Sequence, residues 1–304
     1  MAKVSIKNLP GEELFFGHAG CVGCGGTLAA RLALKVLGSK TMLVMPPCCV
    51  MAVSCFYPQI PFRVPALISS FAGTAAVLSG ISAGLRVKNK EGYHVVGFAG
   101  DGGTADIGLQ ALSGAVERGD RFIYICYDNE AYMNTGAQRS GATPRGTRTT
   151  TTPVTGASQG ENRPKKDMFR IMLAHGIPYA ATASIAYPVD YFEKVSRAMN
   201  TGGPSYIHVL APCPTGWGLD SSLTVQAARL AVETGLWPLM EYDGGQVQLT
   251  KNPANRKPVS SYLKMQGRFK HFAPEDISFV QKQVDDYWAK AREKETLPGG
   301  MPMW

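Results

Sequence analysis

The chain has 304 residues, of which 45% are hydrophobic and 18% charged, so it contains enough apolar material for a sizeable core. Its net charge of +8 comes from scattered basic residues without a recognised nucleic-acid motif, which argues against nucleic-acid binding and suits an acidic protein partner better. No apolar stretch approaches the roughly 20 residues of a membrane helix and no export signal opens the sequence, so a cytoplasmic protein without membrane attachment is expected.

Short apolar runs rich in β-branched and aromatic residues alternate with segments of helical spacing. In chain order the pattern predicts a helix over 26–38, a strand over 41–46, a helix over 73–87, a strand over 94–100, a helix over 103–119, a strand over 122–128, helices over 167–176 and 188–200, and a strand over 205–211. This alternation is typical of a doubly wound α/β fold with a mostly parallel sheet. We expect this domain to cover residues 1–241.

Two segments depart from the alternation. Residues 141–166 form a polar Thr/Gly/Pro stretch that is too long for an ordinary connection, which favours a functional loop or lid over simple disorder. From about Tyr242 the strand–helix rhythm is lost, and an amphipathic helix is predicted from Pro274 to about Glu293. We therefore treat 242–304 as a C-terminal extension, expected to pack on partner subunits, with packing on its own domain as the alternative.

The chain has an odd number of cysteines and no export signal is expected, which argues against a disulfide framework. Reduced thiols or metal ligands remain as interpretations. In GHAGCVGCGG, Cys21 and Cys24 are three positions apart among glycines, a pattern compatible with a zinc knuckle, a redox disulfide or an iron–sulfur cluster. Cys126 lies within an apolar strand and is interpreted as a small buried hydrophobic residue. The full set is Cys21, Cys24, Cys48, Cys49, Cys55, Cys126 and Cys213.

A glycine-rich turn joins a predicted buried strand to a helix in GFAGDGGTADIG. The glycines Gly100, Gly102 and Gly103 leave backbone N–H groups open to a phosphate. Asp101 in the middle of this turn would repel a diphosphate unless a divalent cation lay between them. The turn therefore predicts a diphosphate site with a metal ion.

A second metal ligand is expected at the end of the neighbouring strand, where Asn129 follows the apolar run. Between Gly102 and Asn129 lie 26 residues, enough for one helix and one strand. GDG followed by Asn at this spacing is the thiamine diphosphate motif, in which Mg²⁺ takes the Asp, the Asn side chain and a nearby backbone carbonyl. The alternative is a tight turn without nucleotide and a strand-end Asn cap.

Thiamine diphosphate also needs a carboxylate at its aminopyrimidine ring, normally supplied by a second α/β domain. The residues after Asn200 are too few for such a domain. A partner subunit is therefore expected to complete the site.

Five long motifs occur in order along the chain: GHAGCVGCGGTLAARLALKVLG, GDGGTADIGLQALSGAVERG, YICYDNEAYMNTGAQRSGATP, LAHGIPYAATASIAYP and HVLAPCPTGW. Together they resemble the β subunit of pyruvate:ferredoxin oxidoreductase and its 2-oxoacid:ferredoxin relatives over nearly the whole chain. The resemblance implies the thiamine diphosphate-binding fold with this cofactor, Mg²⁺ and one [4Fe–4S] cluster.

Site residues follow from the same resemblance. The cluster ligands are implied to be Cys21, Cys24, Cys49 and Cys213. Cys49 is also implied to lie at the cofactor, and it is preferred over Cys48 because ungapped alignment with the family's third cysteine ends there. Zinc bound by the same thiolates is the alternative. The implied Mg²⁺ ligands are Asp101, Asn129 and the backbone carbonyl of Ala131, beside the diphosphate-binding Gly100, Gly102 and Gly103. Asn134 corresponds to an active-site Asn near the reacting carbon, against the simpler interpretation of a turn-forming Asn.

The implied activity is oxidative decarboxylation of a small 2-oxoacid, with electrons passed through the cluster. For pyruvate, coenzyme A accepts the acetyl group. The implied partners are an α subunit that supplies the aminopyrimidine half and much of the substrate pocket, a ferredoxin-like cluster subunit, and ferredoxin as acceptor.

Two departures from the family pattern keep a second substrate open. MPPCCVMAV and SSFAG replace an ATGC-like turn and an acidic FEN or FED segment. Loss of the acidic residue favours an additional negative charge on the substrate. Oxalate, converted to CO2 without coenzyme A as by the family member oxalate oxidoreductase, is therefore an alternative to pyruvate. A non-redox thiamine decarboxylase subunit is a more distant one, as is a structural zinc-bearing subunit.

Overall fold

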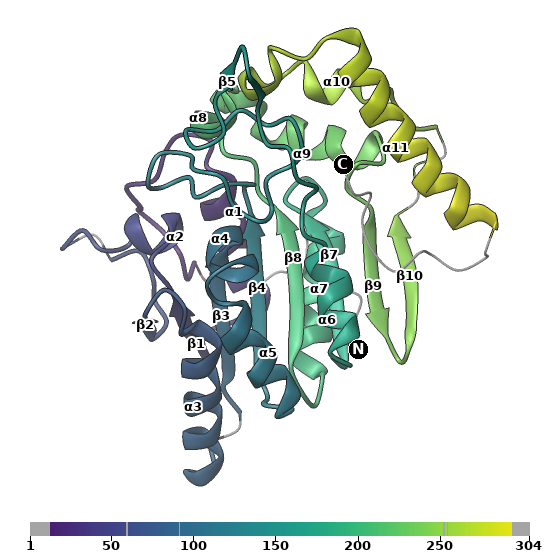
Figure 1. The fold of residues 1–304 in the computed structure, drawn as a ribbon. Helices are drawn as coiled ribbons and strands as arrows, with labels where there is room; N and C mark the ends of the chain where they lie inside the picture. The colour runs from purple at the N-terminus through teal and green to yellow at the C-terminus, as the bar shows by residue number, and fades with distance from the viewer. Residues whose placement is uncertain (1–12, 59, 91, 252, 254, 294–304) are drawn as a thin grey trace.

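The computed structural model describes residues 13–293 except 59, 91, 252 and 254. Within these residues an eight-stranded sheet has the order β10-β9-β7-β8-β4-β3-β1-β2 (Figure 1). Neighbours from β2 to β7 pair in parallel, whereas β9 is antiparallel to β7 and β10 is antiparallel to β9. The strands are β1 (Thr41–Met45), β2 (Ala66–Ile68), β3 (His94–Gly100), β4 (Ile123–Asp128), β7 (Tyr179–Ser184), β8 (Ser205–Leu210), β9 (Leu239–Asp243) and β10 (Gln246–Lys251), with β5 (Val154–Thr155) and β6 (Ser158–Gln159) forming a separate hairpin.

Helices cover both faces of the sheet. One buried cluster contains Leu34 of α1 and Val195 of α7, and the other contains Leu78 of α3, Leu112 of α5 and Phe169 of α6. The doubly wound α/β prediction is therefore confirmed. The helices are α1 (Gly25–Leu37), α2 (Cys49–Ala52), α3 (Thr74–Val87), α4 (Asp101–Ala105), α5 (Leu109–Glu117), α6 (Met168–Ala174), α7 (Pro188–Asn200), α8 (Pro214–Trp217), α9 (Thr224–Glu233), α10 (Ser260–Leu263) and α11 (Pro274–Glu293), with 3₁₀ turns η2 (Ser221–Leu223) and η3 (Gly267–Phe269).

The predicted strands and helices are present with small shifts at their ends, with one exception. The helix expected over 103–119 is two helices, α4 and α5. The backbone of Asp106 leaves the helical region, with φ −110° and ψ −92°. Its carboxylate accepts the Gly141 N–H at 2.8 Å and lies 2.8 Å from Lys166 Nζ. The break thus turns Asp106 toward the 141–166 segment.

The C-terminal region differs from the expectation that the sheet rhythm ends near Tyr242. Strand β9 runs across the predicted boundary at 241 and continues through a tight turn into β10. Gly244 and Gly245, with φ 57° and 86°, permit this turn. Helix α11 has the predicted bounds, and its Val280 and Val284 are buried in the core of this chain. Packing of the extension on partner subunits stays a prediction.

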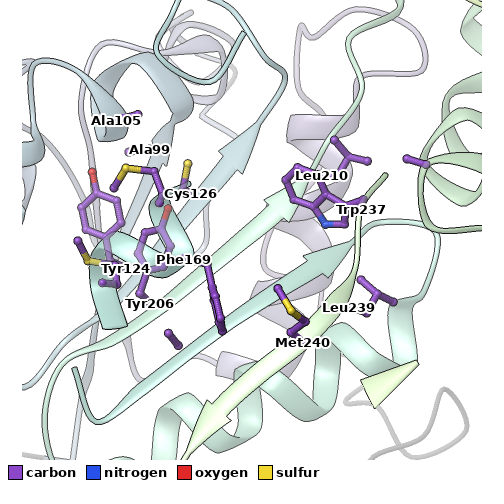
Figure 2. Close-up of a cluster of buried hydrophobic side chains, with 14 of the residues drawn as sticks. Ala99, Ala105, Tyr124, Cys126, Phe169, Tyr206, Leu210, Trp237, Leu239 and Met240 are labelled. Atoms are coloured by element: carbon purple, nitrogen blue, oxygen red, sulfur yellow. The ribbon is translucent and has the colours of Figure 1, made fainter. Parts of the chain in front are cut away.

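The core confirms the interpretation of Cys126. This residue is fully buried on β4 and lies with Tyr124 and Tyr206 among apolar side chains (Figure 2). The 141–166 segment is folded, and it includes the β5–β6 hairpin and the buried Lys165. Among the described helices, none is long and apolar enough to cross a bilayer.

Candidate active site

The predicted cofactor residues meet at the carboxyl ends of two neighbouring parallel strands. Strand β3 ends at Gly100 and is followed by α4, while β4 ends at Asp128 and is followed by Asn129. Ligand sites in open α/β sheets occur at such strand ends. A cavity of about 240 Å³ opens there, lined by Pro47, Cys48, Cys49, Met51, Phe71, Gly100, Asp101, Gly102, Gly103, Tyr127, Asn129, Ala131, Tyr132, Met133, Asn134 and Thr135.

Three predicted Mg²⁺ ligands face one another at this cavity. One terminal atom of the Asn129 amide lies 3.0 Å from Asp101 Oδ1 and 2.9 Å from the backbone oxygen of Ala131. With the amide nitrogen in this place, Asn129 donates to both oxygens. With the amide turned over, its oxygen takes this place, and three oxygens then lie close together at the cavity.

The second carboxylate oxygen of Asp101 is held by a residue outside the predicted motif. Ser140 Oγ donates to Asp101 Oδ2, and both side chains are buried. Burial and then the charge of Asp128 raise the pKa of Asp101 well above its usual range. A nearby cation would reverse this effect by favouring the carboxylate.

The glycine after Asp101 is required by close packing. A Cβ on Gly102 would lie 2.3 Å from a ring carbon of Tyr132. This ring is fixed, because its hydroxyl donates to Asp106 Oδ2 at 3.0 Å and contacts the Gly102 oxygen at 3.2 Å. The absence of a side chain at Gly102 thus keeps the turn and the Tyr132 ring in contact.

Asn134 lies on the rim of the same cavity. It is exposed, in a turn closed by the Gly136 N–H donating to the Met133 oxygen at 3.2 Å. Backbone hydrogen bonds between Tyr132 and Gln138 hold the base of this turn. The structure therefore brings Asn134 to the cavity, and this position is also compatible with a turn-forming Asn.

The CxxC loop packs directly on the segment that carries Cys213. Cys24 is the N-cap of α1, and the next residue, Gly25, donates its N–H to the Pro212 oxygen at 3.2 Å. The loop is also fixed at Gly23, whose oxygen accepts the Thr224 hydroxyl at 2.7 Å. Cys213 in turn is the N-cap of α8 and accepts the Gly216 N–H at 3.3 Å.

The vicinal cysteines have different neighbours. Burial raises the pKa of Cys49, and the thiols of Cys213 and Cys24 raise it further. Burial also raises the pKa of Cys48, but the groups that act on its thiol are the Tyr127 hydroxyl and backbone N–H groups. Of the two vicinal cysteines, Cys49 is therefore the one whose pKa responds to the other candidate cluster ligands. Within the described residues, no three His, Cys, Asp or Glu side chains are arranged to hold a single metal ion.

Comparisons with known proteins agree with this geometry. A family profile described as thiamine pyrophosphate enzyme, C-terminal TPP binding domain, matches residues 48–209. Pyruvate synthase subunit PorB of Methanothermobacter thermautotrophicus is 53% identical over 285 residues, which cover 93% of this chain and 99% of the relative. The chain is a β subunit of the 2-oxoacid:ferredoxin oxidoreductase family.

Other relatives of this β subunit differ in the substrate for which they are named. Ketoisovalerate oxidoreductase subunit VorB of Pyrococcus horikoshii is 48% identical over 293 residues, 94% of each chain. A solved 2-oxoglutarate:ferredoxin oxidoreductase from Magnetococcus marinus matches with a TM-score of 0.56 and 20% identity, covering 75% of this chain and 81% of that one, and shows the shared fold. The β subunit thus has a thiamine diphosphate-binding domain and belongs to a multi-subunit oxidoreductase.

The β subunit also contains a buried charge network that the sequence motifs do not reveal. Lys165 Nζ lies 2.6 Å from Asp128 Oδ2 and 2.8 Å from Glu130 Oε1, and Arg268 pairs with Glu130 Oε2. His208 is hydrogen-bonded to Asp128 at 2.8 Å. Burial opposes ionisation of Asp128, but Lys165 and His208 outweigh it and lower the pKa to about 2. Two carboxylates and two cations therefore surround the Asn129 segment.

Proposed function

We propose that this chain is the thiamine diphosphate- and cluster-bearing subunit of a pyruvate:ferredoxin oxidoreductase. In this reaction pyruvate loses its carboxylate as CO2, the acetyl group passes to the sulfur of coenzyme A with release of the thiol proton, and two electrons pass singly to ferredoxin. The observation that carries the proposal is the convergence of Asp101, Asn129 and Ala131 at one cavity.

The donor set fits Mg²⁺. Magnesium binds oxygen at about 2.0–2.1 Å in octahedral geometry, so oxygens at right angles lie about 2.9 Å apart. The distances of 3.0 and 2.9 Å from the Asn129 amide to Asp101 and Ala131 match this spacing. A bound cation would turn the amide so that Oδ1 faces it. The diphosphate would supply further oxygens beside Gly102 and Gly103.

The thiols support a [4Fe–4S] cluster. Cys24 and Cys213 come from segments in direct backbone contact, and Cys49 is close enough to both to have its pKa raised by them. Burial raises the pKa of the Cys213 thiol, and the thiols of Cys24 and Cys21 raise it further. Four thiolates are the usual ligand set of such a cluster. We therefore assign Cys21, Cys24, Cys49 and Cys213 as its ligands; a single zinc ion on these thiolates is disfavoured, because within the described residues no three such side chains are arranged to hold one metal ion.

The chain's own residues bind and orient the reactants. Thiamine diphosphate, when bound, supplies the electron sink for cleavage of the bond to the carboxylate. Asn134 on the cavity rim would hydrogen-bond the oxygen on which charge develops. Cys49 lines the same cavity, so a cluster bound by it would lie beside the reactants. The α subunit would supply the carboxylate for the aminopyrimidine ring, and a ferredoxin-like subunit would receive the electrons.

The cavity lining favours a substrate with one negative charge. None of its described lining residues is Lys, Arg or His, and Phe71 of the SSFAG segment contributes an apolar ring. A dianion such as oxalate would find no cationic side chain in this half of the pocket. The names of the pyruvate synthase and ketoisovalerate relatives support an uncharged side chain as well. Pyruvate is our first choice, with oxalate as the alternative.

The test is anaerobic viologen reduction by the native complex that contains this chain. Pyruvate, ketoisovalerate and oxalate are each supplied with and without coenzyme A. Turnover of pyruvate that requires coenzyme A is expected. Faster turnover of ketoisovalerate would change the substrate, and turnover of oxalate without coenzyme A would refute the argument from the cavity lining.

A further inference from the structure

Residues far away in the sequence bind the segment from Asn129 to Ala131 through a hydrogen bond and an ion pair. The indole N–H of Trp217 donates to the Asn129 oxygen at 2.8 Å. The Arg268 guanidinium lies 3.8 Å from the centre of the Trp217 ring and pairs with the Glu130 carboxylate. Trp217 is fully buried, and Arg268 and Glu130 are only 2% and 3% exposed. One stack therefore contacts both residues on the N-terminal side of Ala131.

The turn that this stack supports is conformationally unfavourable. Glu130 has φ 67°, in the left-handed region that non-glycine residues rarely adopt. Its N–H donates to Asp128 Oδ1 at 2.8 Å, and its oxygen accepts the Thr143 hydroxyl at 2.7 Å. The surrounding hydrogen bonds thus hold Glu130 in a backbone conformation that is unfavourable for a residue with a side chain. The result is the close approach of the Ala131 oxygen to the Asn129 amide.

The two cations on Glu130 are not redundant. Lys165 binds Oε1 and Arg268 binds Oε2, so each carboxylate oxygen has its own partner. Arg268 is itself fixed by Gln266, whose Oε1 accepts the Nε–H at 2.8 Å. Removal of Arg268 would leave a buried oxygen without its charge partner, a costly state that a shift of the turn would relieve.

We propose that Trp217 and Arg268 are positioning residues that hold the 129–131 turn so that Asn129 and Ala131 face Asp101 before the cation binds. This inference rests on the proposed magnesium site. It assigns Arg268, in the C-terminal extension, a role in cofactor affinity although it lines no part of the cavity. Groups that orient metal ligands in this way typically contribute about 10- to 100-fold to metal affinity.

The experiment measures Mg²⁺ and cofactor affinity of the assembled complex. Complexes stripped of Mg²⁺ and thiamine diphosphate by chelation are titrated by calorimetry, with Mg²⁺ at fixed cofactor and with cofactor at fixed Mg²⁺. We compare the unchanged complex with Trp217→Phe, Arg268→Met and Arg268→Lys. Arg256→Met is the matched control. Arg256 belongs to the C-terminal extension, as Arg268 does, and it also lies over a tryptophan ring, 4.6 Å from the centre of the Trp288 ring.

We expect Mg²⁺ affinity to fall at least about tenfold in Trp217→Phe and Arg268→Met, with part of it restored in Arg268→Lys and no change in Arg256→Met. At saturating Mg²⁺ and cofactor, kcat should fall much less than affinity does. Unchanged affinity in Trp217→Phe, which keeps an aromatic ring for Arg268 and loses the N–H, would overturn the proposal even if Arg268→Met failed to fold. An equal loss in Arg256→Met would also overturn it.

Asp101→Asn separates this inference from the proposed function. If Asp101→Asn abolishes Mg²⁺-dependent cofactor binding while Trp217→Phe and Arg268→Met leave it intact, only the positioning role is refuted. If Asp101→Asn itself binds Mg²⁺ and cofactor normally, the magnesium site is wrong and both ideas fall.

Discussion

The backbone N–H of Gly25 donates to the carbonyl oxygen of Pro212, so the residue after Cys24 touches the residue before Cys213. The two segments are far apart in the sequence, and this contact brings together the loops that carry the two cysteines. The spacing between candidate cluster ligands therefore depends on a glycine that carries no ligand itself.

Gly25→Ala should lower the iron content of the complex. A Cβ at this position would lie 2.6 Å from backbone atoms of Ala211 and Pro212, which cannot move as a flexible side chain can. The CxxC loop would be pushed away from Cys213. Iron and visible absorbance are measured in anaerobically purified complex. Gly80→Ala, in α3, is the control and should keep its iron, because beyond the local helix backbone no atom lies within 4 Å of the added Cβ. Full iron in Gly25→Ala would contradict the contact's importance.

Cys49→Ser should lower the iron content of the complex, whereas Cys48→Ser should leave it unchanged. Cys49 has Cys213 and Cys24 as neighbours, whereas Cys48 lies against Tyr127. Iron analysis of the two variant complexes should show a loss only in Cys49→Ser, with Cys21→Ser and Cys24→Ser behaving like it. The exposed Cys55→Ser serves as the control. Loss of iron in Cys48→Ser alone would reassign the third ligand.

Asp101→Ala should abolish turnover of the assembled complex while assembly persists. Its carboxylate is the only charged side chain among the three proposed magnesium ligands, so the cation would lose its strongest attachment. Viologen reduction measures turnover, and size-exclusion chromatography measures assembly. Turnover at the unchanged rate would favour a structural role for the GDG turn.

Lys165→Met should destabilise the chain by about 3–5 kcal/mol, because Asp128 and Glu130 would each lose a buried partner. Chemical unfolding of the complex, with the unchanged form beside it, gives the difference. Lys257→Met removes an exposed partner of Glu233 and should change stability by about 0–1 kcal/mol. Similar losses in both variants would show that the buried network is no stronger than a surface pair.

The purified chain alone should not turn over a 2-oxoacid. The carboxylate for the aminopyrimidine ring is expected from the α subunit. Viologen reduction by the isolated chain, reconstituted with Mg²⁺, thiamine diphosphate, iron and sulfide, is compared with the complex. Activity of the isolated chain would refute the need for a second subunit.

The parts of the fold that sequence reasoning predicted are those with a strong local pattern. The strands β1, β3, β4 and β8 can be predicted in this way, because they are apolar and contain β-branched or aromatic residues. Strand β7 was missed because Tyr179–Ser184 consists mainly of small residues, although it is buried throughout. The β9–β10 hairpin was missed as well, and the Asp243-Gly244-Gly245 turn was the available signal.

The site likewise contains residues that a sequence motif predicts and residues that no motif predicts. Asp101 and Asn129 are recognisable because a short motif at fixed spacing contains them. Lys165 and Arg268 have no local pattern, since their partner Glu130 is 35 and 138 residues away. A single Lys or Arg in a polar stretch gives no indication that it is buried. Only the folded chain identifies the support of the site.

The position of Arg268 near the end of the chain has a consequence for biosynthesis. Ribosomes make the chain from its N-terminus, so every proposed cofactor ligand, from Cys21 to Cys213, is synthesised before Arg268. Until then one oxygen of the Glu130 carboxylate lacks its partner and the turn at φ 67° lacks part of its support. The cofactor site is thus completed last, and a chain released before residue 268 carries all the ligands without the fully supported turn that aligns them.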